Sequence, residues 1–238
     1  MLLVLVLSAI SLLEETLTNH PDRNTLTSLG WAGYIVSGSY NQREVTGISA
    51  SWTVPQVNTG AGDGYSSAWV GIGGQLDKTL IQIGTEHNVH RGTEMYYAWY
   101  EMLPDYSIRI ENFTLAPGDS VTASITLVDS ETNEWNMQIM DLTNGKTFDR
   151  NFVYNSTRSS GEWIVERAMV NGQISSLSDF GSITFSDCQV DVRNDKGVIS
   201  NFTHSRVHMT NQQFSTLASA SILNNNGEGF TVSYATRN

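Results

Sequence analysis

Acidic and amide side chains in two strand-like segments are the groups in this sequence best suited to catalysis. In the segment GEWIVE, which ends at Glu166, strand alternation places Glu162, Ile164 and Glu166 on one face. A face with two acids and one aliphatic residue makes a poor dry core, because buried charges are costly. We therefore expect this face to line a groove, where Glu166 meets Gln82 from the apolar segment TLIQIGT.

Gln82 and Glu166 together can hydrolyse an amide bond. A glutamine amide donates a hydrogen bond at any pH, so Gln82 can hold an oxyanion in acid. A glutamate beside apolar or aromatic groups has a raised pKa, so Glu166 can be general base to water and then acid to the leaving amine. These roles suffice for direct attack of water without a covalent intermediate. Spacing alone, however, favours a strand glutamine that simply pairs with its neighbours.

Paired carboxyl groups also suggest a glycosidase. Glu162 and Glu166 lie four residues apart on one strand, about 13 Å at about 3.3 Å per residue. Glycosidase pairs need roughly 5 Å for retention and up to about 9.5 Å for inversion, so these two cannot flank one bond. Glu101, in YAWYE, can pair with either of them across strands. A jelly-roll glycosidase thus stays open, as does a lectin-like carbohydrate-binding module that uses Trp69 and Trp99.

Other catalytic and metal-binding patterns are missing from the sequence. It contains no Gly-x-Ser-x-Gly elbow, phosphate loop, His-Glu-x-x-His, Asp-Thr-Gly or Asp-Ser-Gly. His87 and His90 are three residues apart and would face opposite sides of a strand, so they suit a metal only in a loop. We expect both to be surface histidines.

The segments that must position these residues read as about a dozen short strands. They have the regular spacing and the turn signals of a sandwich or barrel, and Thr143-Asn-Gly145 is a hairpin signal. One helical turn is expected near residues 175–179. Hydrophobic residues form 39% of the chain, enough for a core. We predict an all-β fold, an antiparallel β-sandwich of two sheets.

Charge and cysteine content exclude some partners and bonds. The formal net charge of -11 argues against nucleic acid, which requires a basic patch. Neutrality is approached only in mild acid, near the sequence pI of 4.7. Cys188 is the only cysteine of the 238-residue chain, so no internal disulfide can form, and we expect a buried, inert thiol.

The N-terminal stretch differs from the rest of the chain in being strongly apolar. Met1–Leu13 is apolar, too short to span a membrane, and resembles the apolar part of a secretory signal, although no basic residue precedes it. We therefore expect a secreted protein that acts outside the cell and is not membrane-bound when mature. Residues 1–29 are interpreted as a signal-like or pro-segment remnant with a linker, and residues 30–238 as one β-sandwich domain.

Four motifs that occur in one order resemble those of a known family. They are WVGIGG from Trp69, LIQIG from Leu80, YAWYE from Tyr97 and EWIVE from Glu162. This series is similar to the glutamic peptidases, also called eqolisins, from about Trp31 to the C-terminus. The resemblance implies acid-acting, pepstatin-insensitive endopeptidases that act on polypeptides. It also implies a sandwich of two curved antiparallel sheets in the concanavalin/lectin-like jelly-roll class, without metal or cofactor, and we expect a monomer.

The same resemblance assigns site residues one by one. The family's catalytic glutamine and glutamate fall on Gln82 and Glu166. Trp69, Trp99 and Glu101 should line or brace the substrate groove. Glu86 stands where fungal members often carry Asp and would be a second acidic partner, while Glu162 would lie just outside the groove or in solvent. Gly73 departs from the pattern, because fungal members often have Asp there.

Overall fold

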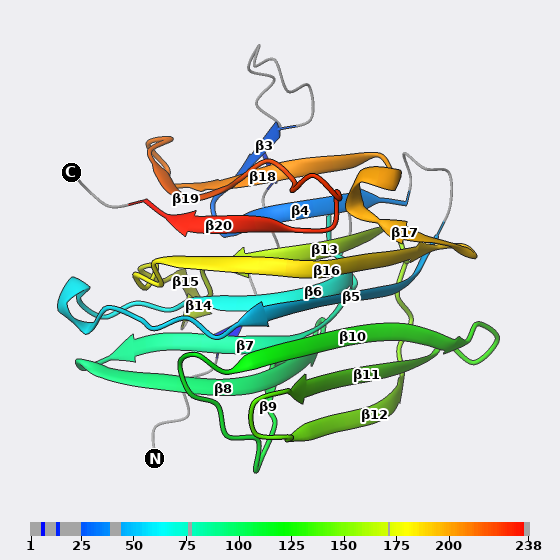
Figure 1. Ribbon diagram of the computed structural model, residues 1–238, viewed down its shortest axis with the longest axis horizontal. Helices are drawn as coiled ribbons and strands as arrows, with labels where there is room; N and C mark the ends of the chain where they lie inside the picture. Colours follow the sequence, from blue (N-terminus) through cyan, green and yellow to red (C-terminus); the bar gives the residue numbers. More distant parts are fainter. Residues whose placement is uncertain are drawn as a thin grey trace.

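The computed structural model describes residues 25–38, 44–75, 78–170 and 172–235, and the backbone of Val6–Leu7 and Leu13–Glu14. Strands stacked in two curved layers make up most of this part of the chain (Figure 1). The predicted all-β antiparallel sandwich is confirmed. Two short 3-10 turns are present as well, η1 (Thr59–Ala61) and η2 (Ile199–Asn201).

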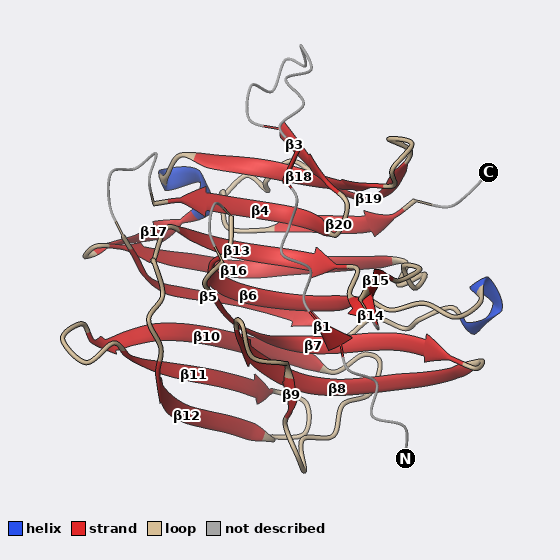
Figure 2. Cartoon of the chain, turned by 180° about the vertical axis from the view of Figure 1, so that it is seen from behind, coloured by secondary structure: helices blue, strands red, loops and turns tan. Residues whose placement is uncertain are grey.

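The first layer contains the strand of Glu166 near its centre, and Figure 2 shows this layer from outside. Neighbouring strands in it are antiparallel, except the parallel pair β3–β18. Its spatial order is β3 (Thr25–Ser28), β18 (His204–Thr210), β4 (Trp31–Ser37), β13 (Ser160–Glu166), β6 (Ser67–Gly73), β7 (Leu80–His90), β8 (Thr93–Met102) and β9 (Ile108–Arg109).

The second layer lies in front in Figure 1 and is joined to the first where β18 pairs with β19. Its spatial order is β19 (Thr216–Ala220), β20 (Phe230–Tyr234), β16 (Ser182–Val192), β5 (Val45–Thr53), β10 (Ser120–Asp129), β11 (Glu134–Asp141) and β12 (Thr147–Val153). The shorter strands are β2 (Leu13–Glu14) on β3, β17 (Asp195–Val198) on β16, and a small sheet of β1 (Val6–Leu7), β14 (Met169–Val170) and β15 (Gln173–Ile174).

Strand alternation divides the side chains of the first layer between two apolar clusters. On β13, Trp163 and Val165 enter the main core between the layers, with residues such as Ile125 from the opposite sheet. Ile164 points the other way and packs in a second, smaller cluster on the outer face. That second cluster consists of Trp31, Ile35, Trp69, Leu80, Trp99, Leu103, Ile164 and Val207.

Histidine placement differs from expectation. His87 is fully buried rather than at the surface, because β7 continues to His90 and alternation turns His87 into the core. Its Nε2 atom lies 2.8 Å from Thr85 Oγ1, which also accepts a 2.9 Å hydrogen bond from Trp52 Nε1. Burial lowers the pKa of His87 to about 3. His90 is only partly buried.

The structure confirms some of the other local predictions and contradicts one. The hairpin at residues 143–145 is confirmed, since it joins β11 to β12. The helical turn near residues 175–179 is wrong: this stretch is not helical, and Leu177 forms a parallel bridge with Tyr65. Cys188 is buried, and burial raises the pKa of its thiol. Thr25–Ser28 pairs with β18 as part of the first layer, although it precedes residue 30.

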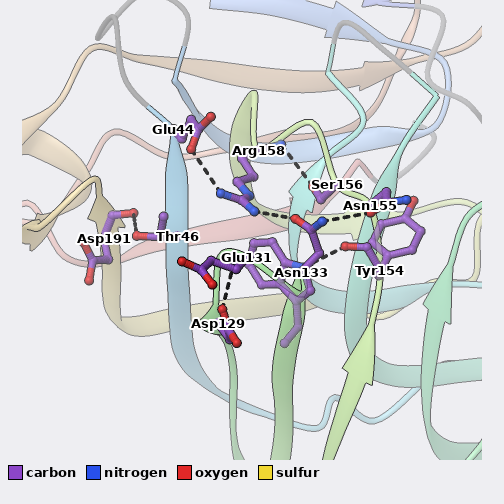
Figure 3. A network of polar contacts seen from close by, with 11 residues as sticks. Glu44, Thr46, Asp129, Glu131, Asn133, Tyr154, Asn155, Ser156, Arg158 and Asp191 are labelled. Carbon is purple, nitrogen blue, oxygen red and sulfur yellow. Dashed lines mark hydrogen bonds and ion pairs between the residues drawn. The ribbon is translucent and has the colours of Figure 1, made fainter.

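A polar network holds the chain where it enters β13 (Figure 3). Arg158 donates to Asn133 Oδ1 at 2.6 Å and to Glu44 Oε2 at 3.2 Å, and its guanidinium lies 5.8 Å from the Trp135 ring centre. Asn133 in turn donates to Asn155 at 3.0 Å. Arg158 precedes the first residue of β13 by only two positions, so this network fixes the start of the strand that carries Glu166.

Candidate active site

On the outer face of the first layer, the predicted residues lie in rows. A row is a set of residues that pair directly opposite one another across neighbouring strands. In the first row, Gln82 on β7 lies directly opposite Glu101 on β8 and, on its other side, opposite Gly71 on β6. Gly71 is in turn opposite Glu162 on β13. Gln82, Glu101 and Glu162 therefore share one line across four strands.

A row four residues further along the strands contains Glu166. Ser67 on β6 lies opposite Glu166 on one side and opposite Glu86 on the other, and Glu86 is opposite Tyr97. The Cα atoms of Glu86 and Glu166 are thus about 9.6 Å apart, two strand spacings. Gln82 and Glu166 share the same face of the sheet, but in different rows.

The row between them is built around Trp69. Its Nε1 atom donates a 2.8 Å hydrogen bond to Glu166 Oε2, and its ring meets Trp31 edge to face at 5.1 Å between centres. Two neighbouring positions must be glycine for this packing. A Cβ on Gly84 would lie 2.5 Å from Trp69 Cβ, and one on Gly71 would lie 2.8 Å from the Trp69 ring.

A small cavity lies at the Glu166 row. Its volume is about 10 Å³, enough room for about one water molecule. Three carboxyl groups from three different strands reach it. Its lining is Ser67, Glu86, Trp99, Glu101, Ser107, Glu166 and Ala168. The cavity therefore leaves room for about one water molecule beside the carboxyl groups of Glu86, Glu101 and Glu166.

Gln82 reaches this cavity through Glu101 rather than directly. Gln82 Nε2 donates a 2.5 Å hydrogen bond to Glu101 Oε2. Gln82 Oε1 is buried and has no hydrogen-bond partner within the part of the chain that the structure describes. An amide nitrogen carries two hydrogens, so one N–H of Gln82 is held by Glu101 and the second can serve another acceptor.

Burial dominates the electrostatics of Glu86. Burial raises the pKa of Glu86 well above its ordinary value of 4.5, and the nearby carboxyl groups of Glu166 and Glu101 raise it further. Burial also raises the pKa of Tyr97, with a further contribution from Glu86. The guanidinium of Arg109 lies 4.9 Å from the centre of the Tyr97 ring.

The site is more closed than the sequence suggests. We expected a groove, yet Gln82, Glu86, Glu101 and Glu166 are each at most 2% exposed. The reason is the outer-face cluster of aromatic and aliphatic side chains, which surrounds them, together with wall residues from the segments after β8 and β13. Glu162 is fully buried too, so a solvent-exposed position for it is wrong.

Three residues of the cavity wall were not anticipated. Ser67 could have been found, because it lies two positions before Trp69 and alternation puts both on one face. Ser107 and Ala168 lie outside strands, where spacing carries no such signal. Among the described residues, no group of three or more His, Cys, Asp or Glu side chains is arranged to hold a metal ion.

Comparison with known proteins matches this arrangement to one family. The Peptidase A4 family profile matches residues 29–234. Aspergillopepsin-2 of Aspergillus niger is 29% identical over 74% of this chain and 69% of its own length. Scytalidopepsin B of Scytalidium lignicola is 29% identical over 67% of this chain, which spans 62% of that relative.

Solved structures agree in fold. Scytalido-glutamic peptidase with a transition-state analogue inhibitor superimposes with a TM-score of 0.73 at 23% identity, covering 87% of this chain and 98% of that one. Aspergilloglutamic peptidase from Aspergillus niger gives a TM-score of 0.64 at 27% identity, covering 72% and 99%. With a profile match over most of its length, the chain belongs to the Peptidase A4 family, the glutamic peptidases or eqolisins.

Proposed function

We propose that this protein is an acid endopeptidase that cleaves polypeptides with Glu166 as general base and acid and Gln82 as oxyanion stabiliser. Its family membership supports the reaction class. The single observation that supports the assignment of Glu166 is the one-water cavity beside it, with its carboxylate held by Trp69 Nε1 at 2.8 Å. A general base needs a positioned water within hydrogen-bond reach, and this cavity supplies the position.

The reaction needs only these two side chains and water. Glu166 removes a proton from the water while the water oxygen bonds to the scissile carbonyl carbon. The carbonyl oxygen takes the negative charge and accepts a hydrogen bond from the second N–H of Gln82. Glu166 then returns its proton to the amide nitrogen, the C–N bond breaks, and a carboxylic acid and an amine leave.

Glu101 has a positioning role in this scheme. It accepts from Gln82 Nε2 at 2.5 Å, which restrains the amide and leaves its other N–H available to the reacting group. A neutral amide keeps its donors in acid, whereas a carboxyl group in its place would change with pH. This property suits Gln82 to an enzyme that works at low pH.

Substrate entry requires the walls of the cavity to move. The cavity holds about one water molecule, far less than a peptide needs. Two of its wall residues, Ser107 and Ala168, lie outside strands in the segments that follow β8 and β13. We infer that displacement of these segments admits the substrate and leaves the strands that carry the catalytic groups in place.

We also propose that the protein is secreted and acts in an acidic environment. The apolar stretch Met1–Leu13 supports export, and the pI of 4.7 means that the large negative charge declines only in acid. We also propose that the protein acts as a monomer on polypeptide substrates, because two layers of the same chain enclose its main core. In the described part of the chain, no helix has the length and apolar character needed to span a bilayer.

The lectin alternative loses its physical basis in this structure. It required Trp69 and Trp99 to stack against sugars, but these side chains are only 0% and 4% exposed. The glycosidase alternative stays as an outcome of the experiment. Denatured casein is incubated with the protein between about pH 2 and pH 7 with pepstatin present, beside a reducing-sugar assay on polysaccharides. Cleavage of casein in acid supports the proposal, whereas release of sugar without proteolysis would reject it.

A further inference from the structure

Glu86 is a buried carboxyl group to which the mechanism above gives no task. It is 2% exposed, lines the one-water cavity, and lies two strands from Glu166 with only the small Ser67 between them. Its Oε2 atom is fully buried and has no hydrogen-bond partner among the described residues. A buried polar atom without a partner is costly, so its position at a cavity calls for an explanation.

Hydrogen bonding decides which of the cavity's three carboxyl groups keeps a proton. Carboxyl groups that share one site cannot all ionise, because like charges at close range disfavour each other. Glu166 accepts from the indole N–H of Trp69, and Glu101 accepts from the amide N–H of Gln82. Both bonds favour the charged form of the acceptor. Glu86 Oε2 receives no such bond, so Glu86 is the member that stays neutral.

The remaining charged and titratable groups around Glu86 favour the same state. On β8, Tyr97 lies directly opposite, and Tyr65 is close enough on the β6 side to interact with its charge. Arg109 on β9 is directed to the Tyr97 ring rather than to Glu86. Burial and the neighbouring carboxyl groups both raise the pKa of Glu86.

We propose that Glu86 is a second catalytic group, a protonated acid that donates a hydrogen bond into the cavity, to the oxygen on which charge develops. This inference rests on the proposed peptidase function. Gln82 and Glu86 lie four residues apart on the same face of β7, about 13 Å between their Cα atoms. The carbonyl oxygen would accept from both donors only between the two side chains, each leaning along the strand toward the other. Glu86 keeps its proton throughout, so the proton balance between water, Glu166 and the leaving amine is unchanged.

Under this proposal, activity should fall as the pH rises. Ionisation of Glu86 removes the donor and places a second negative charge beside the developing oxyanion. The pH at which activity fails on the alkaline side is then set by Glu86 rather than by Glu166. A glutamine at position 86 would keep a neutral donor of nearly the same shape at every pH.

The test compares Glu86→Gln, Glu86→Ala and the exposed control Glu111→Gln by kcat and KM on denatured casein across the pH range. We expect Glu86→Gln to keep acid activity within about 10-fold of wild type and to extend it to higher pH. Glu86→Ala should lose about 100- to 1,000-fold in kcat, the usual cost of one oxyanion donor. Glu111→Gln should match wild type in rate and pH profile.

Two kinetic results would overturn the proposal. If Glu86→Gln is as inactive as Glu86→Ala, a transferable proton or a charge is needed and a fixed donor does not suffice. If both variants are active with the wild-type pH profile, Glu86 only fills space. Circular dichroism and thermal unfolding of each variant show whether it is folded before its rate is interpreted.

An infrared measurement separates this inference from the peptidase proposal. The carbonyl stretch of a protonated carboxyl group should persist in the wild-type protein above about pH 5, where free glutamic acid is ionised, and should vanish in Glu86→Gln. This band is expected even if no peptide is cleaved, in which case the proposed function fails by itself. Its absence from the wild type contradicts the protonated state of Glu86 whatever the activity.

Discussion

Trp69 Nε1 donates a 2.8 Å hydrogen bond to Glu166 Oε2, although the two residues are 97 positions apart in the chain. Register makes this contact possible, because Trp69 pairs with Ile164 and the indole reaches one row further along the same face. The bond occupies one oxygen of Glu166 and orients the carboxylate toward the cavity. In the proposed mechanism, Trp69 therefore acts through Glu166.

Replacing Trp69 with Phe should separate this positioning role from packing. The variant keeps an aromatic ring but loses the N–H, and a hydrogen bond to a charged group contributes about 1.5–3 kcal/mol. We expect kcat to fall roughly 10- to 100-fold with KM nearly unchanged. Steady-state kinetics on casein measure this, and Trp163→Phe, in the main core on the opposite face, is the matched control. Equal losses in both variants would refute a specific role for Trp69.

The contact between Gln82 and Glu101 predicts non-additive kinetics. Glu101→Ala removes the acceptor that orients the Gln82 amide, and we expect a kcat lower by about 10- to 100-fold. Once Gln82 is already Ala, the same change at Glu101 should cost little more, because both residues act through one group. A double-mutant cycle on kcat measures the coupling. Fully additive losses would mean that Glu101 works independently of Gln82.

His87 should limit stability in acid. Burial lowers its pKa from 6.5 to about 3, so between these values the unfolded chain binds more protons than the folded one. Its contribution to stability is therefore complete above pH 6.5 and declines as the pH falls toward 3. Each pKa unit corresponds to about 1.4 kcal/mol, so the total effect is several kcal/mol. Chemical unfolding of wild type and His87→Leu at a series of pH values should show a flatter acid limb in the variant; parallel curves would contradict this assignment.

Glu86 should limit stability at higher pH, whereas His87 limits it in acid. Its pKa is raised in the folded protein, chiefly by burial, so its contribution to stability is present below pH 4.5 and is lost as the pH rises through the folded value. We expect the thermal midpoint to decrease from mild acid toward neutral pH. Glu86→Gln cannot ionise and should lose less over the same range. Differential scanning fluorimetry across the pH series checks this, and an identical decline in both proteins would count against it.

Gly73 marks a position where the family's frequent Asp cannot simply be restored. Its φ of +93° lies in the region that favours glycine, and a Cβ there would lie 2.4 Å from the carbonyl oxygen of Thr79. Gly73→Asp should therefore destabilise the fold by at least about 1–2 kcal/mol without improving activity. Thermal unfolding and casein cleavage test both parts. A stable and more active variant would show that the backbone here accepts an acidic side chain.

Much of the fold could be predicted from the sequence, because alternation and turn signals are local. The faces of β13 follow from this pattern, and so does the grouping of Glu162, Ile164 and Glu166. Register between distant strands is not local. It places Gln82 opposite Glu101, in a different row from Glu166, and nothing in the spacing of single segments indicates this.

Burial of the site also escaped prediction for a physical reason. Acidic residues on a strand normally indicate contact with solvent, and this expectation led to an open groove and a solvated alternative for Glu162. The structure instead surrounds the acids with Trp31, Trp69, Trp99 and their apolar neighbours. His87 was misplaced because the sequence alone does not show that β7 extends over eleven residues, to His90.

The most direct test of the central claim is the kcat of Glu166→Gln and Gln82→Ala on denatured casein in acid, measured on variants whose thermal unfolding shows an intact fold. Loss of the general base should lower kcat by about 100- to 10,000-fold, and loss of one oxyanion donor by about 100- to 1,000-fold. Wild-type activity in either folded variant would contradict the assignment of Glu166 and Gln82 as the catalytic pair.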